Sequence, residues 1–164
     1  MNEEYIQLPN RGDHNCFGCS PVNTSGLQMR FYTNETAVYS NVTVPDHLCG
    51  WNNLVHGGVL STILDEIMSW SALYLLKRVP MTKSMTVDFI KPVYIGRDLS
   101  VHGTVLEKTN EREALIEGRI MNEKEVCCAR ATGIFAVFSP AVAKRLRITD
   151  DESLKWFERI FNLE

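Results

Sequence analysis

Apolar and polar residues alternate along much of the chain, and the period of this pattern changes in one central segment. Residues 28–33 and 36–44 have the composition of two strands, the second rich in β-branched and aromatic residues and ended by Pro45. From about residue 59 to 77, apolar residues recur at spacings of three and four, and others occupy the remaining faces. This period predicts one helix that is buried on several sides, and Pro80 prevents it from continuing much further.

Four more strands are predicted after this helix. Their alternating residues lie within segments 85–90, 99–105, 113–120 and 125–138, and the turns between the segments are short. Short turns favour an antiparallel meander. The order of elements therefore predicts an α+β fold in which a curved antiparallel sheet wraps around one long helix. Such a sheet leaves exposed edges, which favours pairing with a second copy of the chain.

The two ends of the chain have different patterns from the centre. Residues 1–27 contain a dense set of turn-forming residues, which predicts an irregular cap. Residues 150–163 have the pattern of a final amphipathic helix, and Thr149 and Glu152 have the spacing of a capping box. This helix is expected to dock on the domain or on a partner subunit.

Composition limits the class of protein. The 164 residues suit one domain, which we expect over residues 1–140 with a helical extension over residues 141–164. The net charge of -3 and the lack of a dense basic stretch predict that nucleic acid is not a partner. No signal peptide and no membrane-spanning stretch are readable, which predicts a cytoplasmic protein without a membrane partner.

The five cysteines are an odd number, which in an apparently cytosolic chain favours thiols over a disulfide framework. His14, Cys16 and Cys19 have the spacing of metal ligands, and Cys49 could supply a fourth. A zinc site needs four well-placed donors, and only one CxxC pair is visible. We therefore expect no metal site, and a segment that packs as a small cap over the mouth of the barrel or over the substrate.

Two adjacent acids, Asp65 and Glu66, lie within the predicted buried helix. Burying an ionised carboxylate is costly, so a chain keeps one there only with a partner or a chemical task. The alternative is that one acid lines a solvated seam while the other pairs with a basic group. Because consecutive helical residues are about 100° apart, the two acids cannot face one site equally.

A His56-Gly57-Gly58 turn immediately precedes the helix. Glycines leave backbone amides uncovered, and amides at a helix start carry the positive end of the dipole, which suits a developing oxyanion. The alternative is an ordinary turn with a surface histidine. Asp65 lies nine residues beyond His56, roughly 13 Å along a helix, so one chain cannot bring both groups to one reacting atom. If they cooperate, a second subunit must supply one of them.

Three blocks of the sequence resemble the hotdog-fold thioesterases. The run from His56 to Glu66 resembles their signature, in particular that of the phenylacetate-pathway type. Residues 81–93 resemble the next block of the family, a strand that ends in a basic residue and a proline. Residues 16–27, which begin Cys-Phe-Gly-Cys, resemble the opening block of a bacterial subgroup. Together the blocks cover roughly residues 14–138.

This resemblance implies a hotdog fold and hydrolysis of an acyl-CoA thioester to a carboxylate and CoA. It implies no metal or redox cofactor, since CoA is part of the substrate. It also implies a homo-oligomer, either a dimer or a dimer of dimers, whose active sites lie between subunits. The identity of the acyl group is not predicted, and its candidate pocket residues are Trp51, Met68, Trp70, Tyr74 and Phe89.

The resemblance further implies catalytic roles. Asp65 matches the catalytic carboxylate, as general base or as nucleophile, in preference to the adjacent Glu66. Gly57, with Gly58, matches the amide that polarises the thioester carbonyl. His56 matches the histidine that orders the loop or helps to hold the substrate.

Four further residues are implied at the site, Thr82 with a catalytic role and the other three as substrate-binding residues. Thr82 falls where relatives often place a hydroxyl that positions water. Lys91 falls where a basic residue can meet the nucleotide end of CoA, and Pro92 follows it in the same block. Asn53 is near the position of an asparagine or glutamine that some relatives carry before the His-Gly-Gly turn, but the match is not specific.

Two alternative functions remain on the same fold. The first is a non-catalytic acyl-CoA binding protein or sensor, which fold alone does not distinguish from an enzyme. The presence of Asp65 favours the enzyme, and no appended DNA-binding segment is seen. The second is a hydratase or dehydratase, which would use an Asp and a His in a different pattern that this sequence lacks.

Overall fold

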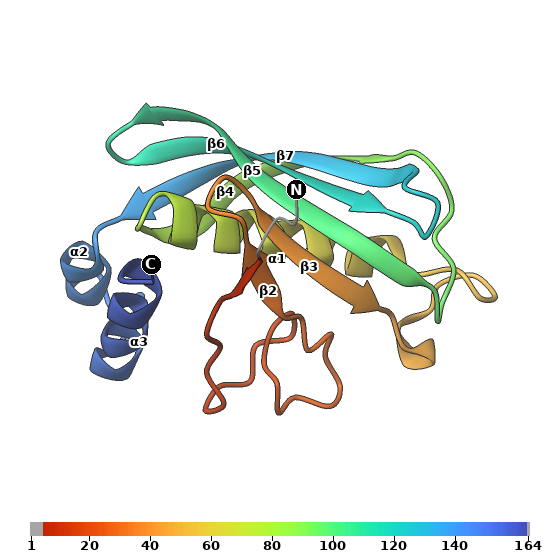
Figure 1. The fold of residues 1–164 in the computed structure, drawn as a ribbon, viewed down its shortest axis with the longest axis horizontal. Helices are drawn as coiled ribbons and strands as arrows, with labels where there is room; N and C mark the ends of the chain where they lie inside the picture. The colour runs from red at the N-terminus through yellow and green to blue at the C-terminus, as the bar shows by residue number, and fades with distance from the viewer. Residues whose placement is uncertain (1–4, 164) are drawn as a thin grey trace.

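The fold is built around one helix that lies against the concave face of a curved sheet (Figure 1). The computed structural model describes residues 5–163. Helix α1 (Gly57–Leu75) is the central element, and the antiparallel sheet has the order β1-β2-β3-β5-β6-β7-β4. This confirms the predicted α+β arrangement. The strands are β1 (Ile6–Gln7), β2 (Phe31–Thr33), β3 (Val38–Thr43), β4 (Val79–Phe89), β5 (Asp98–Asn110), β6 (Glu113–Met121) and β7 (Cys127–Phe138).

Helix α1 is buried over most of its circumference, as its sequence predicts. Ile63, Leu64 and Ile67 are fully buried in the core. Strand β5 passes unusually close to the helix, since a Cβ atom at Gly103 would lie 2.3 Å from the hydroxyl oxygen of Ser71. A glycine is therefore required where the sheet and the helix meet most closely.

The N-terminal segment lies on the side of α1 away from the sheet, and the second of two C-terminal helices contacts α1 (Figure 1). Helix α3 (Asp151–Phe161) is joined to the N-terminal segment by a 2.8 Å hydrogen bond from the indole N–H of Trp156 to the carbonyl oxygen of Pro9. The Trp156 ring also meets the Trp70 ring of α1 edge to face. The predicted cap contacts α1 directly, since the Cys16 thiol donates a hydrogen bond to Glu66 of α1; residues 1–4 lie outside the described part of the chain.

The predicted four-strand meander is wrong in one strand. Strands β5, β6 and β7 do form a meander, but β4 pairs with β7 at the edge of the sheet and not with β5. The connection over residues 90–97 therefore crosses from the edge strand β4 past β7 and β6 to β5. Strand β4 also contains Pro80, predicted only to terminate the helix. An edge strand tolerates proline because the missing N–H need not join the ladder.

The ends of the helices differ from the predicted boundaries. Helix α1 begins two residues early, at Gly57, and Lys77, with a φ of 53°, lies just after its end. Asp150 caps α3 by accepting a 2.8 Å hydrogen bond from the Ser153 amide, so the predicted capping box at Thr149 and Glu152 is not formed. A short helix α2 (Pro140–Arg145) was not predicted, because six residues are too few to display a helical period.

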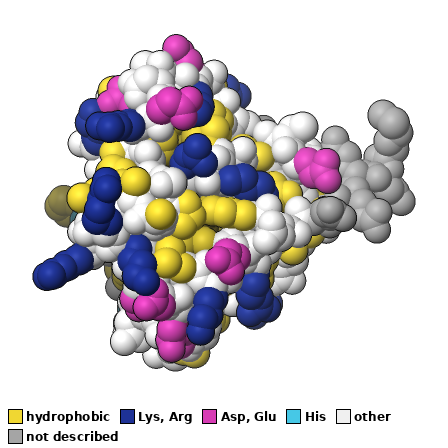
Figure 2. Space-filling view, turned by 90° about the vertical axis from the view of Figure 1, so that its left-hand side faces the viewer, with side chains coloured by type: hydrophobic (Ala, Val, Ile, Leu, Met, Phe, Trp, Pro, Cys, Tyr) yellow, Lys and Arg dark blue, Asp and Glu magenta, His cyan; other side chains and the backbone are white. Residues whose placement is uncertain are grey.

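One end of the molecule combines basic and apolar side chains. Figure 2 shows this face, where α2, α3 and the β5–β6 hairpin lie, with Lys and Arg side chains around apolar ones. The face is at the C-terminal end of α1 and therefore away from the His56 turn. Within residues 5–163, no helix has the length and apolar character needed to cross a membrane.

Candidate active site

A polar stripe interrupts the buried surface of α1. Thr62, Asp65 and Ser69 are each half-buried, and their spacings of three and four residues place them on one face of the helix. Strand β4 lies beside this face. The Thr82 hydroxyl of β4 donates a 2.6 Å hydrogen bond to Oδ1 of Asp65. The structure thus brings together two of the predicted catalytic residues, and within the described residues no other donor is hydrogen-bonded to this carboxylate.

Strand β4 exposes apolar side chains at the edge of the sheet. It pairs with β7 on one side, and no strand of the described chain pairs with its other side. Met81, Phe89, Ile90 and Tyr94, in β4 and the loop after it, are between 47% and 56% exposed. An unpaired edge with exposed apolar residues is a surface on which a second chain can pair.

The His56 turn distinguishes two glycines that the sequence left equivalent. The imidazole Nδ1 of His56 accepts a 3.0 Å hydrogen bond from the Gly58 amide, so His56 caps α1. The Gly57 amide has no acceptor among the described residues. Gly57 is therefore the residue whose N–H is available to an oxygen of a ligand, at the positive end of the helix dipole.

Gly57 opens onto a hollow between the loop before α1 and the end of β4. Predicted site residues Gly57, Lys91 and Pro92 lie together in its lining. Asn53 is outside this lining, and its carbonyl oxygen accepts a 2.8 Å hydrogen bond from the Ile95 amide. The lining consists of Leu54, Val55, Gly57, Leu60, Phe89, Ile90, Lys91, Pro92 and Val93.

The candidate acyl-pocket residues are only partly brought to this hollow. Phe89 lines it, while Met68 and Tyr74 are buried. Trp70 is also buried, and its ring stacks on Phe31 with centroids 4.3 Å apart. Trp51 is 86% exposed and does not line the hollow.

The two groups of site residues are separated within one chain. Asp65 and Thr82 do not line the Gly57 hollow. Eight residues of continuous helix separate Gly57 from Asp65, which corresponds to about 12 Å at 1.5 Å per residue. Within one chain, the uncommitted amide donor and the carboxylate therefore lie at two separate places.

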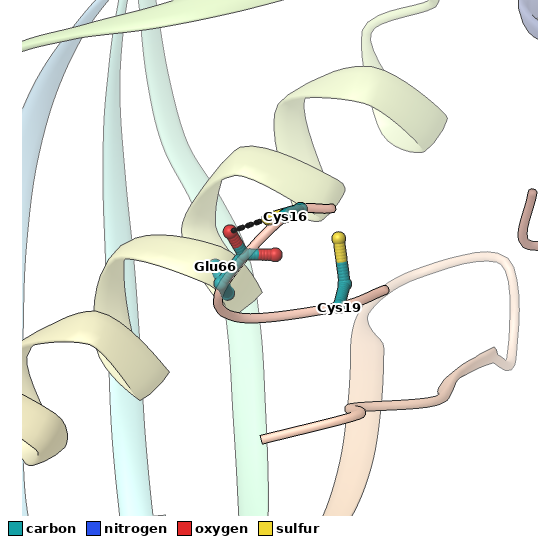
Figure 3. A group of neighbouring side chains, drawn as sticks. All are labelled: Cys16, Cys19 and Glu66. Carbon is teal, nitrogen blue, oxygen red and sulfur yellow. Dashed lines mark hydrogen bonds between the residues drawn. The ribbon is translucent and has the colours of Figure 1, made fainter. Parts of the chain in front are cut away.

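Glu66 faces a different environment from Asp65 (Figure 3). Its Oε1 accepts a 3.3 Å hydrogen bond from the thiol of Cys16, and a Cβ atom at Gly18 would lie 2.2 Å from its Cγ. Burial raises the pKa of Glu66 to about 8. The sequence did not reveal this contact, because the two partners are fifty residues apart and only the folded cap brings them together.

The CxxC pair is electrostatically coupled. A hydrogen bond from the Cys19 thiol lowers the pKa of Cys16 to about 5, and the same interaction, with burial, raises the pKa of Cys19. The other predicted metal ligands are not part of this group. The Nδ1 atom of His14 accepts a hydrogen bond from the Cys16 amide at 3.3 Å. Cys49 forms an isolated backbone β-bridge with Val55.

Comparison with known proteins supports the class suggested by fold and site. Residues 52–129 match the family model described as "Thioesterase superfamily". The chain is 29% identical over 150 residues to the uncharacterized protein C26H8.11c of Schizosaccharomyces pombe, with 82% of each chain covered. The chain therefore has the hotdog fold, and its residues 52–129 are similar to the thioesterase superfamily.

Solved structures show the same fold at low sequence identity. The thioesterase superfamily protein RHA08564 aligns with a TM-score of 0.65 and 21% identity, over 71% of this chain and 57% of that one. The Streptococcus mutans protein smu.793, bound to acetyl-CoA, aligns with a TM-score of 0.60 and 18% identity, over 63% and 82%. The Escherichia coli PaaI protein aligns with a TM-score of 0.58 and 18% identity, over 63% and 73%.

The cap formed by His56 predicts a specific stability change. Replacing His56 by Ala removes the acceptor of the Gly58 amide and should lower the free energy of unfolding by about 1 kcal/mol. His56→Asn should recover most of the loss, because asparagine is a favourable N-cap residue. Urea denaturation of the three proteins measures the difference. Equal stability of the Ala and Asn variants would show that His56 does not act as a cap.

Proposed function

We propose that this protein hydrolyses acyl-CoA thioesters, using Asp65 of one chain and the Gly57 amide of another. One observation carries the proposal. The Asp65 carboxylate lies beside the unpaired edge of β4, and the Gly57 amide at the start of α1 has no acceptor, but the two groups are about 12 Å apart along the helix. A thioester carbonyl needs both groups at once, and one chain cannot supply both.

A second copy of the chain satisfies this requirement by symmetry. If two chains join along β4 about a two-fold axis, the two α1 helices run in opposite directions beside each other. Asp65 of each helix then lies towards the N-terminal end of the other helix. The apolar side chains exposed at β4 would be buried in the same contact. One interface therefore forms two equivalent sites.

The proposed chemistry assigns one step to the Gly57 amide and one to Asp65. The Gly57 amide and the helix dipole stabilise the negative charge that develops on the carbonyl oxygen. Thr82 holds Oδ1 of Asp65, which leaves Oδ2 to deprotonate a water molecule or to attack the carbonyl carbon itself. The tetrahedral intermediate then collapses, the C–S bond breaks, and the CoA thiolate leaves with the bonding electron pair. If Asp65 is the nucleophile, this step leaves an anhydride between the acyl group and Asp65, and water then hydrolyses the anhydride to the free acid and Asp65.

Asp65 is preferred over Glu66 because of where each side chain lies. Glu66 is enclosed by the CxxC loop of its own chain, whereas Asp65 lies beside the open β4 edge. Lys91 lines the Gly57 hollow and would meet a phosphate of the CoA nucleotide. The acetyl-CoA bound to the Streptococcus mutans protein of the same fold supports a CoA ester as the ligand class.

Removing the carboxylate charge tests the catalytic assignment. Asp65→Asn should lower the turnover number by at least about a hundredfold, because the general base is lost and the shape is kept. Asp151→Asn, which changes an exposed carboxylate of α3 away from β4, is the matched control and should retain activity. Assays should cover short, medium, long and aromatic acyl-CoAs.

Two results would contradict this assignment. The first is a near-normal turnover number for Asp65→Asn on the best substrate. The second is a wild-type protein that binds acyl-CoAs without hydrolysing any member of the panel, which would make it a binding protein.

Subunit complementation tests the shared site. Gly57 occupies the first position of α1, where proline is compatible with a helix, and His56 before it is already extended. Gly57→Pro therefore removes the uncommitted N–H and retains the helix, while Gly57→Ala retains the N–H and is the control. After subunit exchange between Gly57→Pro and Asp65→Asn proteins, one site of each mixed dimer contains neither change.

A shared site predicts that activity returns to about one normal site per mixed dimer. The Gly57→Ala protein should stay active, because a Cβ atom there meets only Phe89, at 3.6 Å. Native mass spectrometry confirms the exchange. Mixed dimers that remain inactive would show that each site is contained within one chain.

A further inference from the structure

Three metal-binding side chains converge between the cap and α1. The sulfur atoms of Cys16 and Cys19 and a carboxylate oxygen of Glu66 all lie within 4.8 Å of one another. Figure 3 shows the two cysteines on the cap loop and Glu66 on the facing helix. The sequence predicted no metal site because it revealed only the CxxC pair. The folded chain adds a third donor from a distant segment.

Backbone hydrogen bonds hold the CxxC loop in this arrangement. The Ser20 amide donates to the carbonyl oxygen of Cys16 at 3.2 Å, and the Met29 amide donates to that of Gly18 at 3.0 Å. The side-chain amide of Asn10 donates to the carbonyl oxygen of Cys19 at 2.5 Å. The two sulfur positions are therefore fixed by the local fold, which reduces the ordering cost of binding an ion.

Glu66 has no basic partner in the described part of the chain. Among residues 5–163, no Lys, Arg or His forms an ion pair with Glu66. The charges that act on it come from Cys16 and Asp65, which are both negative when ionised. A half-buried carboxylate beside two thiols, without a basic partner, is an environment that a bound cation stabilises.

We propose that Cys16, Cys19 and Glu66 bind a zinc ion. Two thiolates select zinc over magnesium or calcium, and carboxylate oxygen is an accepted third ligand. A tetrahedral ion with Zn–S distances of about 2.3 Å requires donors roughly 3.8 Å apart, a small contraction of the present group. Cys16 is only half-buried, so a water molecule can occupy the fourth position. Binding releases the protons of the two thiols and of any protonated carboxyl group.

This zinc ion would fasten the cap to the helix that carries the polar stripe. Glu66 follows Asp65 directly in the sequence, so the ion would fix α1 one residue away from the Asp65 carboxylate. The inference does not depend on the proposed hydrolysis. Zinc binding and thioesterase activity are measured separately, and either result can fail without the other.

Metal titration of the full-length protein tests the site. Reduced, chelator-treated protein should bind one zinc ion per chain, measured by calorimetry and elemental analysis. Cys16→Ser, Cys19→Ser and Glu66→Gln should each weaken binding by at least about a hundredfold, the upper end of the effect of outer-shell changes. Cys49→Ser and Cys127→Ser are matched controls and should bind zinc like the parent. Equal affinity of Glu66→Gln and the parent would overturn the three-donor site.

X-ray absorption of the zinc-loaded parent protein tests the donor set without any variant. The proposal predicts two sulfur donors at about 2.3 Å and two oxygen donors at about 2.0–2.2 Å. Four sulfur donors, or none, would contradict it. Failure of the reduced protein to bind zinc, with formation of a Cys16–Cys19 disulfide in oxidised glutathione, would replace the metal site with a redox pair.

Discussion

The burial of α1 between the curved sheet and the N-terminal cap is the constraint on which the remaining features depend. Apolar side chains cover most of the helix circumference, and the sheet approaches so closely that β5 needs Gly103 opposite Ser71. Any polar residue on such a helix must have a partner or an open side. The positions of the polar residues on α1 therefore mark where it has an open side or a polar partner.

Adjacent acids consequently acquire different surroundings. Rotation by about 100° per residue directs Asp65 towards Thr82 and the β4 edge, and Glu66 towards the CxxC loop. Asp65 is accessible and oriented by one hydroxyl, which suits a catalytic carboxylate. Glu66 is half-buried against two thiols, which suits a ligand of a cation. The two acids of one helix thus lie in different surroundings, which is why we propose a separate role for each.

The sequence predicted the features that depend on local pattern. Helical periodicity identified α1, alternation identified the strands that wrap it, and the turn at Gly57 and the position of Asp65 indicated a site. It could not predict the pairing of β4 with β7, because pairing between distant strands leaves no trace in local spacing. The contact of Glu66 with Cys16 was also unpredictable, since it depends on how the cap folds over α1.

The capping of α1 shows how a small geometric detail refines a sequence motif. The motif contains two glycines with equivalent local chemistry, and either amide could polarise a carbonyl. In the folded chain, the His56 side chain occupies the Gly58 amide and leaves the Gly57 amide without an acceptor. The histidine thereby selects the donor, although it need not contact the substrate itself.

A crystal structure of the assembled protein with a nonhydrolysable acyl-CoA analogue tests the central claim most directly. The account predicts the analogue's carbonyl oxygen about 2.7–3.2 Å from the Gly57 amide of one subunit. Asp65 of the other subunit should lie within about 3.5 Å of the carbonyl carbon or share one water molecule with it. A carbonyl held by groups of a single chain, or bound away from Gly57, would contradict the account.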